Sequence, residues 1–195
     1  MARPLIVLAS TSPYRRDLLA RLRLPFDVRA PSVNEMALPR EQPRDTALRL
    51  ARAKALDVAR DCTGAIVIGA DQTVDLDGVT LGKPHSHQAA LDQLQALQGR
   101  TAIFSSALAV VAPDGLIEVD CIPTTVAFRS LPRMQLEAYL RADEPYDCAG
   151  SAKIESLGIA LIERVVSDDP TALIGLPLIR LTSMLAAVGV NVLEQ

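Results

Sequence analysis

A run of hydroxyl and basic side chains near the start of the chain has the make-up of an anion site. The Ser-Thr-Ser sequence of residues 10–12 follows an apolar run, and Pro13 then opens a segment with leucines at helical spacing. Hydroxyls, free N–H groups and the positive end of a helix dipole together suit a phosphate group. Arg15 and Arg16 add positive charge in the first turn. The alternative is an ordinary helix cap with two surface arginines.

Two acidic residues have surroundings that suit metal-assisted chemistry. Asp71 follows the apolar run 65–70 and is expected at the end of a buried strand, where open α/β sheets bind ligands. Glu35 falls in a long proline-bounded loop, residues 31–45, and loops of that length are usually functional or mobile. Carboxylates together with substrate phosphates are typical ligands of Mg²⁺ or Mn²⁺. The alternatives are a turn aspartate at 71 and a solvated charge at 35.

Lysine is scarce, with only three lysines among the 20 basic residues of the chain. Lys54 follows the long loop, Lys83 stands in a Leu-Gly-Lys-Pro sequence, and Lys153 lies in a polar segment. Lysine supplies a compact point charge, whereas arginine supplies a planar fork. The retained lysines therefore favour a polyphosphate ligand.

Other residues with reactive side chains are interpreted as structural. His85 and His87 stand at a predicted helix start with no third ligand nearby, so exposed cap residues are expected rather than a metal pair. Cys148 has no neighbouring base, so it is not expected to be a nucleophile. The sequence contains neither G-x-x-x-x-G-K-[ST] nor G-x-G-x-x-G, which argues against P-loop and Rossmann proteins.

The elements that must position these side chains alternate between strands and helices. Strands are predicted at 5–9, 26–30, 65–70, 101–112, 116–128 and 157–166, with a hairpin over 74–79 around an Asp-Gly turn. Helices are predicted from residue 13, over 46–59, from the Ser86 cap to 97, over 131–141 and over 176–188. This mixture indicates an α/β fold with a mixed sheet. Because no linker is visible, a single domain, residues 1–195, with two lobes sharing one sheet is expected.

Composition and charge exclude several classes of partner. The chain has 195 residues, of which 49% are apolar and 22% charged, as in ordinary globular domains. A net charge of −3 and six aromatic side chains without tryptophan argue against a nucleic acid polymer or a membrane as partner. Three scattered cysteines fit a reducing compartment, and no stretch approaches the length of a leader or a membrane span. A cytoplasmic location is therefore expected.

Several motifs, taken together, resemble those of the Maf family of nucleoside triphosphate pyrophosphatases. Residues 8–19, Leu-Ala-Ser-Thr-Ser-Pro-Tyr-Arg-Arg-Asp-Leu-Leu, are similar to the opening signature of the family. Further blocks follow in the order and spacing of the family, at Lys54, 69–72, 81–84, 99–101, 148–151, 163–164 and 174–178. The resemblance implies an elongated mixed-sheet α/β fold, similar to that of inosine triphosphate pyrophosphatases, with two lobes around a deep central cleft. It also implies hydrolysis of nucleotides to the monophosphate and diphosphate.

The resemblance also implies roles for individual residues. Asp71 would accept the proton of the attacking water and, together with Glu35, would bind a divalent cation (Mg²⁺, Mn²⁺ or Co²⁺). Asn34 stands where the family often has aspartate before the loop glutamate. These roles agree with the needs of phosphoanhydride hydrolysis, which are mainly positioning, charge neutralisation and a proton acceptor. The side chains implied on the phosphates are Ser10, Arg15, Lys54 and Lys83.

Three positions bear on substrate choice. Tyr14 stands where the dTTP and UTP branch of the family typically has arginine, and residues 151–156 lack the Gly-Ile-Gln-Gly stretch of that branch. Both features are similar to the branch that hydrolyses 7-methyl-GTP, which implies Tyr14, Gln72 and Glu155 as specificity residues. N7-methylation makes guanine cationic, so an aromatic face and a carboxylate would both attract it. Without the resemblance, the alternatives are core packing for Tyr14 and pairing with Lys153 for Glu155.

The resulting hypothesis is a cytoplasmic, metal-dependent pyrophosphatase that converts 7-methyl-GTP to 7-methyl-GMP and diphosphate and so removes a modified nucleotide. The alternatives are a dTTP/UTP or broad-range pyrophosphatase and a non-catalytic nucleotide-binding regulator of septum formation. A pure binding protein has no need of Asp71, Lys54 and Lys83 together. The expected partner is a small nucleotide, and both a monomer and a homodimer are compatible with the sequence.

Overall fold

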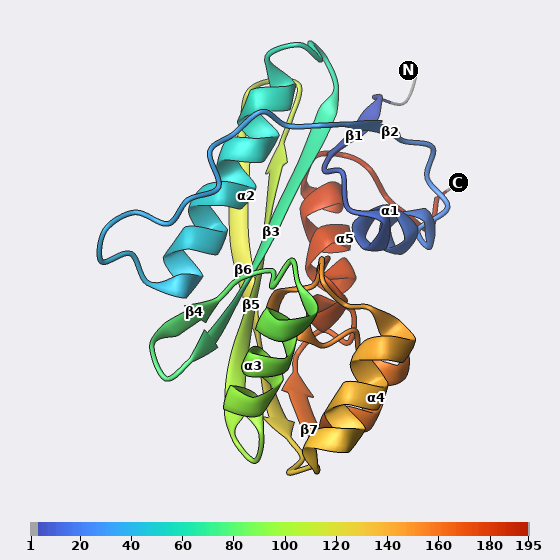
Figure 1. Cartoon of the computed structure of the whole chain (residues 1–195). Coiled ribbons are helices and arrows are strands. Elements are labelled where there is room, and N and C mark those ends of the chain that lie inside the picture. Colours follow the sequence, from blue (N-terminus) through green and yellow to red (C-terminus); the bar gives the residue numbers. More distant parts are fainter. Residues whose placement is uncertain (1–3, 195) are drawn as a thin grey trace.

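A single mixed sheet runs the length of the molecule in the computed structural model, which describes residues 4–194 (Figure 1). Its seven strands are β1 (Ile6–Ala9), β2 (Asp27–Arg29), β3 (Ile66–Leu76), β4 (Val79–Leu81), β5 (Thr101–Val111), β6 (Ile117–Phe128) and β7 (Ile162–Ser167). The strand order is β2-β1-β3-β5-β6-β7, and β4 pairs with β3 outside this path. The prediction of an α/β fold with a mixed sheet is confirmed. The ends of the expected domain, residues 1–3 and 195, lie outside the described residues.

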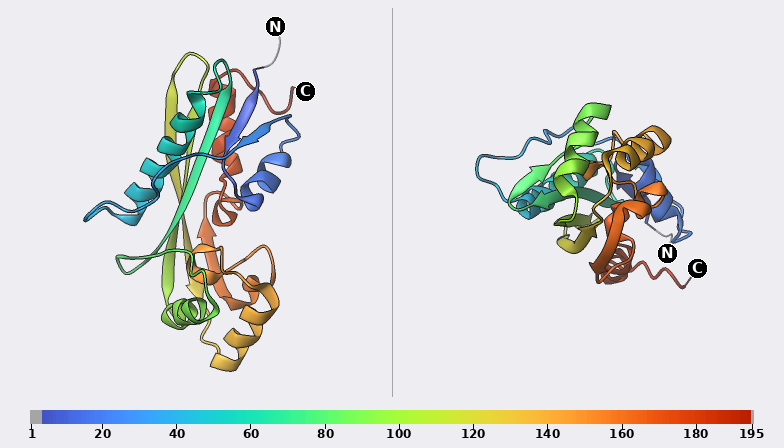
Figure 2. Two further views of the ribbon diagram at one scale, coloured as in Figure 1. Left: turned by 45° about the horizontal axis from the view of Figure 1, so that its top comes forward. Right: turned by 60° about the horizontal axis from the view of Figure 1, so that its bottom comes forward.

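The helices cover both faces of the sheet. They are α1 (Pro13–Ala20), α2 (Pro43–Ala59), α3 (His87–Leu97), α4 (Arg133–Asp143) and α5 (Leu178–Ala187). At one end of the molecule α2 lies on one side of the long strands, and α1 and α5 lie on the other (Figure 2). At the opposite end α3, α4 and β7 lie together. No helix within residues 4–194 is long and apolar enough to cross a membrane.

Pairing along β3 changes partway along the strand and leaves a short open edge. β1 runs parallel to β3 as far as the pair Ala9–Gly69, and β4 pairs antiparallel from Val74 onward. Between these points, the edge of β3 over residues 70–73 has no strand beside it among the described residues. The opposite edge is paired with β5 throughout this region. The fold therefore exposes a stretch of central strand to whatever the neighbouring loops place beside it.

The side-chain alternation of the strands builds two apolar cores at one end of the sheet. Ile66 and Ile68 pack on the face that carries α1 and α5, whereas Val67 packs on the face that carries α2. A strand that is buried on both faces reads as a continuous apolar run, which is why residues 65–70 could be predicted as a central strand.

A third core lies further along the sheet, and polar residues separate it from the first. Val74 and Phe104 pack with α3 and α4. Because every second residue of a strand faces the same way, Val74 shares its face with Ile68, and Gln72 lies between them. Gln72 is paired with Ser106 on β5, and its amide donates a hydrogen bond to the Ser106 hydroxyl at 2.8 Å. One face of the sheet thus carries two apolar cores with a polar gap between them.

Three predicted elements differ from the structure. Asp71 lies in the middle of β3 rather than at its end, because β5 pairs with the strand as far as Asp75. Helix α2 begins at Pro43 rather than at 46, since proline suits the first turn of a helix. Residues Leu157–Leu161 form a 3₁₀ helix, and strand β7 begins only at Ile162. The remaining boundaries differ by one or two residues.

Candidate active site

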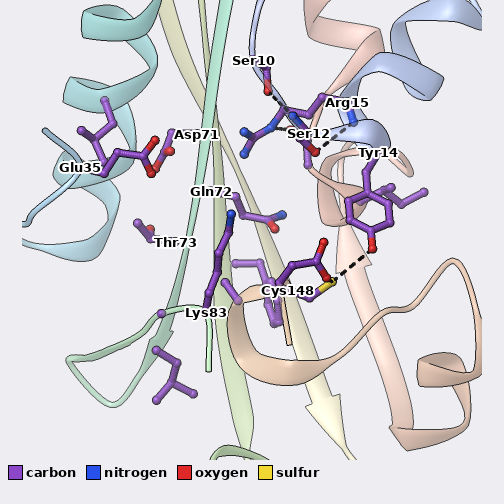
Figure 3. Close-up of a pocket in the computed structure, with 18 of the residues that line it drawn as sticks. Ser10, Ser12, Tyr14, Arg15, Glu35, Asp71, Gln72, Thr73, Lys83 and Cys148 are labelled. Carbon is purple, nitrogen blue, oxygen red and sulfur yellow. Dashed lines mark hydrogen bonds between the residues drawn. The ribbon is translucent and has the colours of Figure 1, made fainter. Parts of the chain in front are cut away.

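A cleft of about 640 Å³ opens beside the unpaired edge of β3 (Figure 3). Its walls come from the β1–α1 junction, the loop before α2, the β4–α3 connection and the segment after α4. The nine residues to which the sequence analysis gave a catalytic, binding or specificity role line this cleft: Ser10, Tyr14, Arg15, Glu35, Lys54, Asp71, Gln72, Lys83 and Glu155. Lys153, the third of the scarce lysines, is not among the lining residues. The fold therefore gathers residues from across the sequence in one place.

Lys54 joins the two acidic residues that were expected to bind a metal. Its Nζ lies 2.7 Å from Oδ1 of Asp71 and 2.8 Å from Oε1 of Glu35. Lys54 and Asp71 are buried, on α2 and β3, whereas Glu35 reaches the same point from an exposed loop. Two carboxylates thus converge on one cation position at the wall of the cleft.

The approach of α2 to β3 that makes this contact possible depends on Gly69. A Cβ at this position would lie 2.2 Å from the carbonyl oxygen of Ala51 and 2.8 Å from Cβ of Ala55. These small helix residues lie on either side of Lys54 in the sequence, so the backbone of α2 rests directly on the strand. Glycine at 69 and alanine at 51 and 55 therefore set the distance between the Lys54 ammonium and Asp71.

The surroundings move the pKa values of the two carboxyls in opposite directions. Burial raises the pKa of Asp71 above its usual range, and the charges of Lys54 and Arg15 offset only part of this rise. Burial acts in the same sense on Glu35, but the hydrogen bond from Lys54 and the nearby positive charges outweigh it and lower the pKa of Glu35. Such a divergence is typical of paired acid and base groups in active sites. The raised pKa strengthens Asp71 as a base, and the lowered pKa weakens Glu35 as one.

The β1–α1 junction provides an anchored guanidinium. Ser12 caps α1, as predicted, because its hydroxyl accepts the Arg15 N–H at 3.4 Å. The Nε of Arg15 donates to the Gly175 carbonyl at 3.0 Å, and its Nη atoms have no protein partner within residues 4–194 (Figure 3). Arg16 instead pairs with Asp17 on the surface. Of the two arginines, only Arg15 therefore contributes to the cleft.

The β4–α3 connection adds a second positive charge. Lys83 is exposed, its side chain points into the cleft, and its charge acts on Glu35 (Figure 3). His85 also lines the cleft, which the sequence analysis did not anticipate. His87 lies elsewhere, within 2.9 Å of both the Tyr146 hydroxyl and the Glu137 carboxylate, and links α3 to α4.

Gln72 is tied to the far wall of the cleft. Its amide nitrogen, which carries two N–H donors, lies within hydrogen-bond distance of three acceptors: the Ser106 hydroxyl and the carbonyl oxygens of Ala172 at 3.2 Å and Leu173 at 3.0 Å. Carbonyls can only accept, so these bonds fix which side of the amide faces the wall. Ser106 donates in turn to the Ala172 carbonyl at 2.6 Å. Ser106 was missed in the sequence, although a serine within an apolar strand was a usable signal.

The end of the cleft that lies across from Glu35 and Asp71 combines an aromatic ring with acidic groups (Figure 3). Tyr14 is half-buried and lines the cleft, so core packing is the wrong interpretation for it. Its hydroxyl accepts a weak hydrogen bond from Sγ of Cys148 at 3.8 Å (Figure 3). Burial and the charge of Asp147 raise the pKa of Cys148 to about 12, so the thiol stays protonated and is a poor nucleophile. Desolvation likewise raises the pKa of Glu155.

The donor set at Lys54 fits a divalent cation brought in with a substrate. Glu35 and Asp71 offer hard carboxylate oxygens, which Mg²⁺ and Mn²⁺ prefer. Among the described residues no group of three or more His, Cys, Asp or Glu side chains is arranged to hold a metal. Mg²⁺ commonly binds through one or two carboxylates and completes its shell with phosphates and water. The residues present match that pattern.

The cleft in this mixed α/β fold has basic side chains, a buried carboxylate and an aromatic ring. These groups define a protein suited to a ligand in which a polyphosphate is linked to a ring. The chain belongs to the Maf family, because residues 5–188 match the model described as Maf-like protein.

Similar proteins share most of this chain. It is 52% identical to the 7-methyl-GTP pyrophosphatase of Albidiferax ferrireducens, covering 96% of this chain and 95% of that protein. It is 53% identical to the protein of the same name from Methylobacillus flagellatus, covering 97% and 100%. Among solved structures, the Ham1 protein of Staphylococcus aureus matches 64% of this chain and 71% of that chain, with 18% identity and a TM-score of 0.46. The nucleoside-triphosphatase (dITP/XTP pyrophosphatase) of Mycobacterium abscessus matches 66% and 76%, with 21% identity and a TM-score of 0.41.

Proposed function

We propose that this chain is a metal-dependent nucleoside triphosphate pyrophosphatase that hydrolyses 7-methyl-GTP to 7-methyl-GMP and diphosphate. The observation that carries the proposal is the buried Asp71 carboxylate, held 2.7 Å from Lys54 at the wall of a cleft with a basic and an aromatic end. The names of the relatives, which match nearly the whole chain, support the same substrate. Cysteines that form no disulfide support a cytoplasmic setting.

The phosphates of the substrate belong at the basic wall. Arg15 offers two free Nη atoms for bidentate contact, and Lys83 adds a mobile ammonium from the opposite side. The hydroxyl of Ser10 lies beside the start of α1, where it accepts the Ser12 N–H at 3.1 Å. Glu35 and Asp71 would hold the divalent cation, which would supply charge neutralisation for the phosphates and promote ionisation of the attacking water.

Asp71 serves as the proton acceptor. Water attacks the α–β phosphoanhydride, its proton passes to a carboxylate oxygen of Asp71, and the P–O bond breaks to release diphosphate. The raised pKa of Asp71 strengthens it as a base, while the contact with Lys54 keeps the carboxylate ionised and oriented. Positive charge from Lys54 and Arg15 offsets the charge that develops on the phosphate oxygens.

The base of the substrate belongs at the aromatic end. The ring of Tyr14 offers a face for stacking, and Glu155 offers a carboxylate for the N–H groups of guanine. A 7-methylguanine carries a positive charge, so both contacts strengthen with methylation. Gln72, whose nitrogen is already occupied, has its amide oxygen left for the ligand.

The test is diphosphate release from 7-methyl-GTP, GTP, dTTP and UTP in the presence of Mg²⁺, Mn²⁺ or Co²⁺. We expect the highest kcat/KM with 7-methyl-GTP and no turnover in the presence of a chelator. A preference for dTTP or UTP would favour the other branch of the family. Thermal stabilisation by nucleotides without any release of diphosphate would favour a binding protein.

A further inference from the structure

The face of the Tyr14 ring already carries a cation that belongs to the protein. The Nζ of Lys153 lies 5.5 Å from the ring centroid, within the roughly 6 Å range of a cation–π contact. The Lys153 backbone is held firmly, since its N–H donates to the Tyr139 hydroxyl at 2.9 Å. Its carbonyl accepts the N–H groups of Ser156 and Gly158, each at 3.1 Å. The polypeptide is therefore built to present this side chain at the ring.

The Lys153 ammonium is otherwise unrestrained. Within residues 4–194 it forms no ion pair, although its charge acts on Glu155. A base that stacks on Tyr14 must take the other face of the ring or displace the ammonium from this one. In either arrangement the flexible stem of Lys153 lets the ammonium contact the edge of that base. An ammonium has three donors and no acceptor, so it recognises acceptor atoms only.

The two forms of guanine present opposite chemistry to this ammonium. Unmethylated guanine offers N7 and O6 as acceptors, and lysine contacts to these atoms are common in base recognition. Methylation at N7 removes one acceptor and adds a positive charge, which repels a neighbouring ammonium. A positive side chain at the Tyr14 face therefore opposes the preference that Glu155 supports.

We propose that Lys153 is a specificity-determining residue that limits the preference for the methylated base and sustains activity toward unmethylated purine triphosphates. This inference rests on the proposed function, because it assumes that the base stacks on Tyr14. In the resulting picture, Glu155 and Lys153 act on the same base in opposite directions. The ratio of the two kcat/KM values, for 7-methyl-GTP over GTP, reports the balance.

Lys153→Met tests the inference, since it removes the charge and keeps the length of the side chain. We expect the ratio to rise about tenfold, through a loss of activity on GTP and an unchanged or higher activity on 7-methyl-GTP. Glu155→Gln should lower the same ratio. Lys153→Arg keeps the charge and the donors and should stay within about threefold of the wild-type ratio. Arg133→Met removes an exposed charge on α4, outside the residues that line the cleft, and should leave the ratio unchanged. Equal losses on both substrates in Lys153→Met would overturn the inference.

A second measurement is independent of hydrolysis and so separates this inference from the proposed function. With only three lysines in the chain, isotope-labelled dimethyl-lysine signals are few, and Lys153→Arg assigns the one that belongs to Lys153. With GMP bound, we expect the Lys153 signal to have the chemical shift of an ammonium in contact with a ligand. With 7-methyl-GMP, we expect it to have the chemical shift of a solvent-exposed lysine. The same response to both nucleotides, or no response to either, contradicts the inference even if 7-methyl-GTP is hydrolysed. Absence of hydrolysis with the expected signals contradicts the proposed function alone.

Discussion

At Asp71, burial and the positive charges of Lys54 and Arg15 act in opposite directions on the pKa of the same carboxyl group. Burial raises its pKa and makes it a better proton acceptor, while Lys54 at 2.7 Å keeps it charged and in place. Lys54 also contacts Glu35, so one side chain orients both carboxylates. A lysine suits this position because its compact charge can serve two carboxylates at once.

Asp71→Asn keeps the shape of the side chain and removes its basicity. We expect turnover of 7-methyl-GTP to fall by about 10²- to 10⁴-fold, the usual contribution of a general base. The fold should persist by circular dichroism, because Lys54 retains Glu35 as a partner. Asp75→Asn, in the nearby hairpin where Asp75 accepts the Gly78 N–H, is a matched control that should retain activity. An Asp71→Asn enzyme within tenfold of wild type would exclude Asp71 as the base.

The pH dependence of activity should follow the raised pKa of Asp71. The carboxylate must be ionised to accept a proton. We therefore expect the fall of kcat/KM on the acidic side of its pH profile (the acidic limb) to occur above about 3.9, the usual pKa of aspartate. Lys54 lowers this pKa, so Lys54→Met should move the limb to higher pH. A limb that shifts to lower pH, or does not shift, would show that Asp71 is not the titrating group.

The raised pKa of Asp71 also makes the stability of the folded protein depend on pH. The folded protein binds the Asp71 proton more tightly than the unfolded chain does. The resulting contribution to the free energy of unfolding is fully present below the pKa that Asp71 has in the unfolded chain. It is lost as pH rises through the folded pKa. Denaturant melts across that window should therefore show wild type losing stability relative to Asp71→Asn as pH increases. The opposite trend would mean that the ion pair with Lys54 outweighs burial.

At the scale of elements, the site depends on how closely α2 lies against β3. Gly69→Ala places a methyl group against the Ala51 carbonyl, where the available gap is 2.2 Å, so the helix must move. We expect a loss of about 1–3 kcal/mol in unfolding free energy, as for other overpacked cores, and a fall in kcat as Lys54 shifts from Asp71. Gly82→Ala, which meets no atom within 4 Å, should melt like wild type. Normal melting and turnover in Gly69→Ala would show that this packing does not position the site.

The sequence predicted helix starts and turns well where the residues that cause them lie close together in the chain. Asp77 and Gly78 both adopt positive φ, as an Asp-Gly hairpin turn requires, and Ser12 and Ser86 cap their helices through side-chain hydrogen bonds. The position of Asp71 was predicted wrongly because the strand continues only by pairing with β5, which is distant in sequence. Apolar periodicity carries no information about such a partner.

At the scale of the whole molecule, the cleft exists because one sheet supports separate apolar cores. Gln72 and Ser106 interrupt the apolar face between them, and loops from both ends of the molecule close around the gap. The residues to which the family resemblance assigns roles all line the cleft. Residue type and spacing alone left Asp71, Glu35 and Tyr14 with structural alternatives. The contacts of Lys54 and Lys153 could not be predicted, because they depend on the three-dimensional approach of α2 to β3 and of residue 153 to the Tyr14 ring.

A ligand that fills this cleft should stabilise the whole molecule. At about 100 times the dissociation constant, binding adds roughly 2.7 kcal/mol to the unfolding free energy. We expect Asp71→Asn, in which turnover should be slowed by at least about 10²-fold, to melt at higher temperature with 7-methyl-GTP and Mg²⁺. A chelator should reduce this shift, because it removes the divalent cation that Glu35 would hold and that would neutralise phosphate charge. If the chelator left the thermal shift unchanged, the metal would have no part in substrate binding.

The most direct measurement of the central claim is the identity of the products formed from 7-methyl-GTP, followed by phosphorus NMR in the presence of Mg²⁺. Cleavage of the α–β phosphoanhydride predicts 7-methyl-GMP and diphosphate in equal amounts, both formed about 10²- to 10⁴-fold more slowly by Asp71→Asn. Formation of 7-methyl-GDP and phosphate, or unchanged substrate with the wild-type protein, would contradict it.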